Sequence, residues 1–380
     1  MIIGLIGKPS SGKSSFFKAA TLIDVKITGI PFCTIKPNVG IGYVIIDCCE
    51  KDFGTKCKPN HGSCKNGKRF VPVRLVDVAG LVPGAHEGRG LGNQFLDDLR
   101  QASVLIHIVD ATGKTDEEGK HVEYHDPEKD IEFLEKEIDL WFASVIAKAT
   151  SKIKPQKDLL QVLAENLSGL EIEKKHIAEA LEKYSISDIN KFATALRKIA
   201  KPIIIAANKI DLKPAQENFE KMKDKHELII PTSAEAEIVL KKAAEKNMLE
   251  YIPGEKFTIL DASKINPAQL AALDTIQKEV IEKYGSTGIQ NCINKAVFEL
   301  LDYIAVYPVA DINKVADKDG NVLPDVYLVP KGTTVKELAF KIHTSLGEKF
   351  IAGIDARTKR RLAADYVLKN NDVIEIAHAK

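Results

Sequence analysis

A glycine-rich loop near the start of the chain constrains its fold more than any other feature. The loop is Gly7-Lys-Pro-Ser-Ser-Gly-Lys-Ser14, and it lies between an apolar run at residues 1–6 and a segment with helical patterning. Its two glycines let the backbone curl so that N–H groups point at phosphate oxygens. Such a loop requires a strand before it and a helix N-terminus after it. The chain is therefore predicted to contain an α/β domain that binds phosphate.

Further short apolar runs supply the other strands of this domain. They are bounded by turn residues and lie at residues 39–47, 70–76, 104–109, 203–207 and 228–230. Runs this short and this apolar are typical of strands buried on both faces of a parallel sheet. The expected fold class is α/β, with a mostly parallel sheet and helices on both faces.

The middle and the end of the chain have different patterns. Apolar residues recur at helical spacing through residues 112–200, which predicts a helical insertion. Residues 304–380 combine short strand runs with a capping box formed by Thr334 and Glu337, which predicts a compact α+β module. The expected domains are a nucleotide-binding domain with a C-terminal helical extension at 1–111 plus 201–303, the insertion at 112–200, and the module at 304–380.

Three motifs at strand ends predict which nucleotide is bound. A carboxylate at Asp211, in Asn208-Lys-Ile-Asp211, accepts from the N1–H and the exocyclic amine of guanine, which adenine does not present. Ser233-Ala234 offers backbone N–H groups to the guanine O6. In Asp77-Val-Ala-Gly80, Asp77 is expected to hold Mg²⁺ through water while the Gly80 N–H approaches the γ-phosphate. Together with Lys13 on the phosphates and Ser14 on Mg²⁺, these motifs predict GTP binding.

The composition excludes several classes of protein. The chain has 54 Lys plus Arg and 53 Asp plus Glu, a net charge of +1, which excludes a strongly basic nucleic-acid-binding protein. A membrane helix needs about 18 consecutive apolar residues, and no run here approaches that length. The first residues lack the charged leader of a signal peptide, and six cysteines in that context indicate a reducing, cytoplasmic setting.

The chain resembles the Obg-type GTPases, in the branch that includes the YchF-like proteins. Besides the motifs above, the residues that carry this resemblance are Pro31-Phe-Cys-Thr-Ile-Lys-Pro-Asn-Val-Gly40 and the glycine-rich segment from Asp77 to Phe95. Residues 304–380 resemble a TGS domain, a ubiquitin-like β-grasp fold. The resemblance implies that Thr34 completes the Mg²⁺ shell in the triphosphate state. The expected nucleotide-binding residues are Lys8, Pro9, Ser10, Ser11, Gly12, Lys13, Ser14, Ser15, Thr34, Asp77, Gly80, Asn208, Lys209, Asp211, Ser233 and Ala234.

Three features distinguish this chain from the YchF-like and Obg-type proteins that it resembles. YchF itself favours adenine through a different base motif, whereas Asp211 here favours GTP; an ATP-preferring YchF-like NTPase is the alternative. Ser10 stands where many Obg relatives have an Asn linked to potassium binding, which leaves potassium dependence open. Leu81 follows Gly80 where glutamine would position the attacking water, so hydrolysis is expected to be slow. His86 and Arg89 are the candidate catalytic residues, with solvated loop residues as the plainer interpretation.

A cluster of sulfur residues indicates a possible structural site. Cys48, Cys49, Cys57, His61 and Cys64 provide the ligand types of a tetrahedral zinc site. A disulfide and unpaired thiols are the alternatives, because the spacing is not that of a standard zinc knuckle.

The leading functional hypothesis is a GTP- and Mg²⁺-dependent switch with slow hydrolysis. The basic run Arg357-Thr-Lys-Arg-Arg361 suggests an RNA contact, or else a solvated loop. TGS modules occur in proteins of translation, so the resemblance implies the ribosome or RNA as partner, bound through this module and the helical insertion. A small-molecule kinase and a nucleotide-dependent scaffold with negligible hydrolysis are the competing hypotheses. The motifs do not specify the oligomeric state.

Overall fold

The computed structural model describes residues 1–21, 38–81, 84, 92–151 and 158–379, and the chain divides into two compact units. Among these residues the first unit comprises 1–21, 38–42 and 73–296, and the second comprises 43–72 and 297–379. Strands β2 (Val39–Asp47) and β4 (Lys68–Asp77) each contribute residues to both units.

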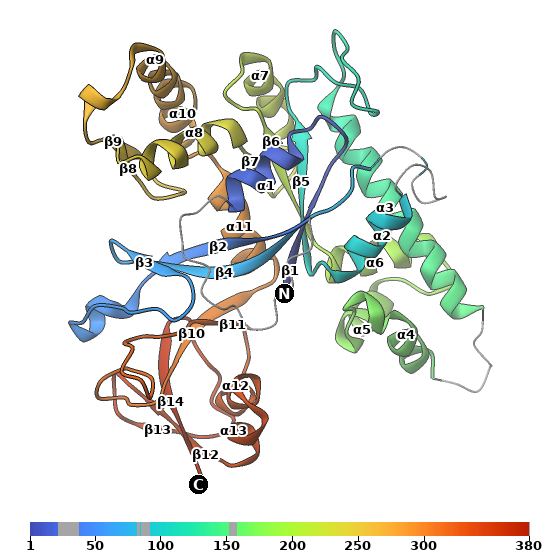
Figure 1. Ribbon diagram of the computed structural model, residues 1–380. Helices are drawn as coiled ribbons and strands as arrows, with labels where there is room; N and C mark the ends of the chain where they lie inside the picture. The colour runs from blue at the N-terminus through green and yellow to red at the C-terminus, as the bar shows by residue number, and fades with distance from the viewer. Residues whose placement is uncertain (22–37, 82–83, 85–91, 152–157, 380) are drawn as a thin grey trace. The chain divides into compact units, whose positions relative to one another are not determined.

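The first unit is built on the predicted sheet (Figure 1). The strand order is β2-β4-β1-β5-β6-β7, with β3 paired to β4. The pairs of β1 with β4 and β5, of β5 with β6 and of β6 with β7 are parallel. The remaining strands are β1 (Ile2–Ile6), β3 (Ser63–Lys65), β5 (Val104–Asp110), β6 (Ile203–Asn208) and β7 (Ile229–Pro231). The expected mostly parallel α/β sheet is confirmed.

Helices surround this sheet and form the insertion after β5. The helices of the first unit are α1 (Lys13–Thr21), α2 (Gly92–Gln101), α3 (Pro127–Thr150), α4 (Leu159–Leu167), α5 (Lys174–Lys183), α6 (Ile189–Ala200), α7 (Lys213–Met222), α8 (Ala234–Glu245), α9 (Pro267–Ile276), α10 (Glu282–Tyr284) and α11 (Ile289–Lys295). A short antiparallel pair, β8 (Leu249–Tyr251) and β9 (Phe257–Ile259), interrupts the later helices. This pair was not expected from the helical pattern.

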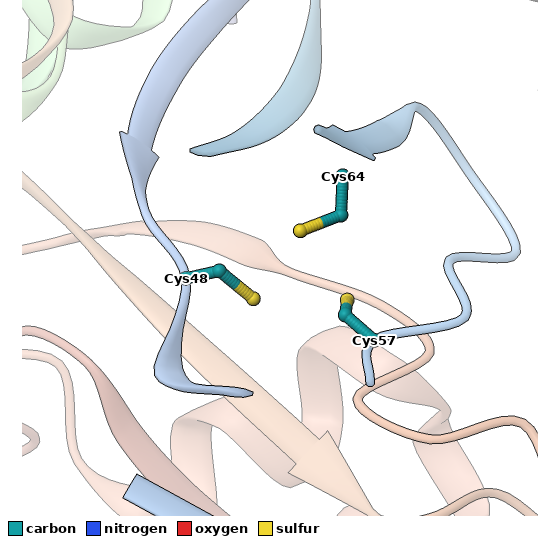
Figure 2. A group of neighbouring side chains, drawn as sticks. All are labelled: Cys48, Cys57 and Cys64. Atoms are coloured by element: carbon teal, nitrogen blue, oxygen red, sulfur yellow. The ribbon is translucent and has the colours of Figure 1, made fainter. Parts of the chain in front are cut away.

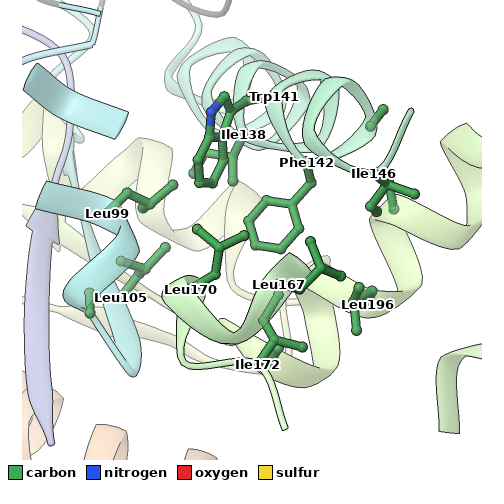
Figure 3. Packing of buried hydrophobic residues seen from close by; sticks show 14 of the residues in the cluster. Leu99, Leu105, Ile138, Trp141, Phe142, Ile146, Leu167, Leu170, Ile172 and Leu196 are labelled. Carbon is green, nitrogen blue, oxygen red and sulfur yellow. The ribbon is translucent and has the colours of Figure 1, made fainter. Parts of the chain in front are cut away.

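The insertion packs its apolar stripe into a shared core (Figure 3). Asp126 caps the N-terminus of α3 by accepting from the Glu128 N–H, and Pro127 occupies the first helical position. Trp141 and Phe142 of α3 meet edge to face, with ring centroids 5.1 Å apart. They lie in one cluster with Leu99 and Leu105, so the insertion buries its apolar face against the nucleotide-binding domain.

The C-terminal module is a five-stranded sheet with a helix against it. Its strand order is β11-β10-β14-β12-β13, in which β10 and β14 are parallel. The predicted capping box is present: Thr334 and Glu337 cap the start of α12 reciprocally. The elements are β10 (Tyr303–Val309), β11 (Tyr327–Pro330), α12 (Val335–Ile342), α13 (Thr344–Glu348), β12 (Phe350–Asp355), β13 (Arg361–Leu362) and β14 (Asp372–His378).

Candidate nucleotide site

The glycine-rich loop has the strained geometry that its sequence predicts. A Cβ on Gly7 would lie 2.5 Å from the Ile108 carbonyl oxygen, so β5 leaves no room for a side chain there. Gly12 has φ +91°, and a Cβ on it would lie 2.2 Å from Nδ2 of Asn208. Both positions therefore require glycine, and α1 begins at Lys13, directly after the second one. The loop N–H groups and the start of the helix lie together, as phosphate binding requires.

Lys13, Ser14 and Asp77 meet at the carboxyl ends of β1 and β4. Leu5 of β1 is the register partner of Asp77 in β4. The Lys13 ammonium pairs with Oδ1 of Asp77, and the Ser14 hydroxyl donates to Oδ2 of Asp77 at 3.3 Å. A hydroxyl and a carboxylate are the hard oxygen donors that Mg²⁺ prefers, so the donor set fits this ion.

The segment after Asp77 runs beside the loop. A Cβ on Gly80 would lie in ordinary contact with Pro9, 3.5 Å away, and the Leu81 N–H donates to the Gly7 carbonyl at 3.2 Å. The Leu81 side chain is only 1% exposed and belongs to the core shared with the insertion. The Leu81 side chain therefore packs into this core, while its backbone contacts the phosphate loop.

Asn208 connects the phosphate loop to the base motif. Its amide donates to the Ser11 carbonyl at 3.1 Å, and its Oδ1 accepts from the Ala234 N–H at 3.2 Å. The Asp211 carboxylate accepts from the Ser233 hydroxyl at 2.6 Å. The same hydroxyl caps α8, because it also accepts from the Ala236 N–H. The predicted base residues are thus brought together at one edge of the sheet.

Lys209 anchors the base motif to the phosphate loop. Its φ of +67° turns the chain, and its ammonium donates to the Ser10 carbonyl at 3.1 Å and pairs with Asp110 at 2.8 Å. Burial alone would raise the pKa of Asp110, but hydrogen bonds from Lys209, Thr112 and Thr115 outweigh it and hold this pKa below its ordinary value. The ion pair fixes the lysine stem beside the loop.

Two predicted donors are engaged inside the protein. The Ser233 N–H donates to the Thr287 carbonyl at 2.9 Å, and the Ala234 N–H donates to Asn208. In this conformation neither N–H group is available to a guanine O6. Thr287 lies on the helical extension, and the sequence gives no signal that would place it here.

The Lys8 side chain points away from the nucleotide site. It is 2% exposed, and its ammonium donates to the Thr115 carbonyl at 2.7 Å and pairs with Asp130 at 2.7 Å. His125 lies on the same carboxylate at 2.8 Å. Burial raises the pKa of Asp130 despite these two partners. Because the Lys8 side chain is engaged elsewhere, only its backbone N–H could bind phosphate.

The segment 112–126 lies against the phosphate loop, which the sequence does not reveal. It forms a small antiparallel turn, in which Thr115 bridges His121 and the Asp116 N–H donates to the Lys120 carbonyl at 2.9 Å. Gly119 has φ +82°, and a Cβ on it would lie 2.7 Å from the Pro9 carbonyl oxygen. This turn therefore buttresses the loop from outside. Thr34, His86 and Arg89 lie outside the described residues.

Three of the five predicted sulfur-site residues come together in the second unit (Figure 2). The Sγ atoms of Cys48, Cys57 and Cys64 all lie within 4.8 Å of one another. Cys49 instead points to the Asn371 carbonyl at 3.7 Å, and His61 pairs with Asp325. None of the four cysteines is joined in a disulfide.

The Cys57 thiol stands apart chemically from its two neighbours. Hydrogen bonds from Cys48 and Cys64, together with the Arg69 guanidinium, lower the pKa of Cys57 to about 3. Hydrogen bonds with Cys48 and Cys57, together with burial, raise the pKa of Cys64.

Two residues of the basic run 357–361 already make contacts within the second unit. Arg357 forms two hydrogen bonds with Asp52, at 2.6 and 3.1 Å, and lies over the Phe53 ring. The Lys359 ammonium donates to the Ile312 carbonyl at 2.6 Å. Arg357 therefore joins the module to the segment after β2, whereas Lys359 makes its contact within the module. Arg360 and Arg361 are exposed.

Family models match three parts of the chain. Residues 2–148 match a model described as a 50S ribosome-binding GTPase, residues 206–311 the G4 motif-containing domain of YGR210-like Obg-like GTPases, and residues 314–378 the TGS domain. In the part of the chain that the structure describes, no helix has both the length and the apolar character needed to cross a membrane.

Whole-chain relatives agree with these matches. An uncharacterized GTP-binding protein of Methanocaldococcus jannaschii is 49% identical, over 100% of this chain and 99% of its own. The ribosome-binding ATPase YchF of Bacillus subtilis is 29% identical, over 98% of this chain and 97% of its own. The crystal structure of a GTP-binding protein from Pyrococcus horikoshii is 41% identical, covers 100% of both chains and superposes with a TM-score of 0.79.

Proposed function

This chain belongs to the YchF-like branch of the Obg-type P-loop GTPases and carries a C-terminal TGS domain, and we propose that it is a GTP-dependent switch with slow hydrolysis. The observation that carries this proposal is the position of Asp211. Its carboxylate is oriented by the Ser233 hydroxyl at 2.6 Å, and Asn208 ties the same edge to the phosphate loop. A nucleotide with its phosphates at Lys13 would thus present its base to a fixed acceptor.

Guanine supplies two donors to such an acceptor, and adenine supplies none in the corresponding positions. Titration of the purified protein with GTP and with ATP, each with Mg²⁺, tests this by calorimetry. Tighter binding of GTP by tenfold or more supports the proposal, and equal affinities would reject it.

Mg²⁺ is proposed to lie between Ser14, Asp77 and the phosphates. The oxygens of Ser14 and Asp77 are 3.3 Å apart, so both can face one ion directly or through water. Lys13 would exchange its bond to Asp77 for the β- and γ-phosphates, because a triphosphate concentrates more negative charge than one carboxylate. The ion would supply charge neutralisation on the phosphates when bound.

Slow hydrolysis follows from Leu81. Its buried side chain is unable to orient a water molecule, so another group or a partner must complete the site. His86 and Arg89 remain the candidates for that group within this chain.

The proposed partner is the ribosome. The B. subtilis relative is named a ribosome-binding ATPase, and one matching family model is named for 50S binding. Exposed Arg360 and Arg361 offer positive charge to RNA phosphates. Co-sedimentation with ribosomes, compared between GDP and a non-hydrolysable GTP analogue, tests the switch. Equal sedimentation in both states would favour a scaffold.

An ATP-preferring NTPase is the second candidate, and one observation favours it. The N–H groups of Ser233 and Ala234 already have partners, which removes two donors for a guanine O6. The calorimetric comparison above separates the two candidates, since ATP would then bind at least as tightly as GTP.

A further inference from the structure

The sulfur atoms of Cys48, Cys57 and Cys64 form a compact triangle in the second unit. Each pair lies within 4.8 Å, although the three residues come from different local elements (Figure 2). Cys48 follows β2, Cys57 lies in the loop after it, and Cys64 lies in β3. At a Zn–S distance of about 2.3 Å, thiolates at the corners of a tetrahedron are about 3.8 Å apart. A contraction of no more than about 1 Å would bring these three sulfurs onto one ion.

We infer that these thiolates bind a structural Zn²⁺ ion, with the Glu50 carboxylate as the fourth ligand. Oε2 of Glu50 accepts from the Cys64 thiol at 3.8 Å and from the Cys57 N–H at 3.1 Å, so it already lies at the edge of the triangle. Cysteine sulfur and carboxylate oxygen are both zinc ligands, so three sulfurs and one oxygen complete the four-coordinate shell that structural zinc requires. Binding displaces the thiol protons to solvent.

Arg69 supplies the charge that such a site needs. Three thiolates and a carboxylate around Zn²⁺ leave a net charge of about −2. Nη1 of Arg69, a side chain 1% exposed, contacts the Cys57 sulfur at 2.7 Å. A buried guanidinium beside a ligating sulfur is the kind of supporting contact that orients and stabilises a metal ligand.

A disulfide explains this arrangement less well. It would join two of the sulfurs and leave the third beside them, with Arg69 still directed at Cys57. Cys49, which is adjacent to Cys48 in sequence, could equally be expected to form a disulfide, yet its sulfur points to the Asn371 carbonyl instead. Three thiols that point toward one another, while Cys49 points away from them, favour a metal site over a disulfide.

The site would fix the loop that holds the C-terminal module. Lys58 N–H donates to the Val322 carbonyl at 2.8 Å, and Asn60 N–H to the Pro324 carbonyl at 2.9 Å. Arg69 donates to the Leu323 and Pro324 carbonyls at 3.0 and 2.7 Å. Zinc would therefore stabilise the pairing of residues 57–61 with residues 322–325 within this unit.

The test uses the full-length protein, stripped of metal under reducing conditions and titrated with Co²⁺ and then Zn²⁺. We expect a thiolate charge-transfer band and intense tetrahedral d–d bands with Co²⁺, saturating at one ion per chain and abolished by Zn²⁺. Hydrogen exchange should slow in residues 57–61 and 322–325 when Zn²⁺ is added. Absence of the charge-transfer band in the wild-type protein would overturn the proposal, even if variants fail to fold.

Variants then assign the ligands. Cys48→Ser, Cys57→Ser and Cys64→Ser should each lose the bound metal, and Glu50→Gln should weaken Zn²⁺ at least tenfold. Cys49→Ser, a change at the adjacent buried thiol, is the matched control and should bind as wild type. Equal metal binding by Cys49→Ser and Cys57→Ser variants, or loss in the control alone, would refute the assignment. Unchanged affinity in Glu50→Gln would refute the fourth ligand.

Discussion

The Asn208 side-chain amide donates to the Ser11 carbonyl at 3.1 Å, so the end of β6 holds the phosphate loop directly. Gly12 follows Ser11, and its missing Cβ makes room for this amide. The residue that begins the base motif is therefore also a structural part of the phosphate site. Base and phosphate binding should consequently be coupled in this protein.

Asp211→Asn should change the preferred base. The new amide presents a donor, which suits the carbonyl of xanthine and not the N1–H of guanine. Loss of a charge-assisted pair costs about 2–3 kcal/mol, or roughly 30–150-fold in GTP affinity. Calorimetry with GTP and xanthosine triphosphate measures both effects. Unchanged GTP affinity in the variant would rule out Asp211 as the base acceptor.

The same substitution at Lys8 and at Lys13, five positions apart, should affect different properties: stability at Lys8 and GTP binding at Lys13. Lys8→Met leaves Asp130 buried without its charged partner, so the free energy of unfolding should fall by about 3–5 kcal/mol. Lys13→Met should leave unfolding nearly unchanged while tight GTP binding is lost. Denaturant titration and calorimetry on both variants provide the comparison. A stable Lys8→Met protein, or a Lys13→Met protein that binds GTP normally, contradicts these roles.

Intrinsic turnover should be slow, about 10⁻⁴–10⁻² s⁻¹, as for GTPases that lack a supplied catalytic group. Single-turnover hydrolysis with and without ribosomes gives this rate and its stimulation. A purified protein that hydrolyses GTP at about 10 s⁻¹ would show that a group within the chain completes the site. His86→Ala would then be the first variant to measure.

His107 should make stability depend on acid pH. Burial lowers the pKa of His107 to about 3, whereas the unfolded chain binds this proton near pH 6.5. The folded state thus holds fewer protons between these values, so stability is full above about pH 6.5 and falls as the pH decreases. The slope approaches 1.4 kcal/mol per pH unit for this group.

Urea titrations from pH 7.5 to 4 measure this dependence. His107→Gln should flatten it, while the matched change at exposed His121 should leave it as in wild type. An equal pH slope in wild type and His107→Gln would show that other groups dominate the acid sensitivity.

Arg360→Ala with Arg361→Ala should weaken any ribosome association and reduce its salt dependence, since each lost phosphate contact removes a released counterion. GTP affinity should not change. Lys336→Ala with Lys349→Ala removes the same charge from exposed positions of the module and serves as control. Identical co-sedimentation for all three proteins across a salt series would indicate that the ribosome contacts the helical insertion and not this basic run.

The sequence predicts this fold well wherever backbone geometry alone specifies the residue. Gly7, Gly12 and the capping box at Thr334 are such cases, because turn conformation and helix ends are local properties. The motif residues at strand ends also came together, since parallel strands place their carboxyl ends at one edge.

Side-chain direction and loop packing were not predictable in the same way. Lys8 and Lys13 lie in one motif, yet only tertiary contacts with Asp130 turn Lys8 inward. The sulfur cluster shows the same limit, because Cys49 and His61 are of the residue types that bind zinc, yet each contacts a residue far away in sequence instead. Contacts between residues far apart in sequence leave no periodic signal.

Gly119 makes an ordinary-looking surface turn intolerant of variation. Surface loops generally accept insertions and new side chains at little cost. Here the turn at residues 115–121 meets the Pro9 carbonyl where Gly119 has no Cβ, so a longer turn or any side chain at this position would displace the phosphate loop. Length variants and tag insertions in this turn are therefore expected to abolish nucleotide binding, although the turn contains none of the motif residues.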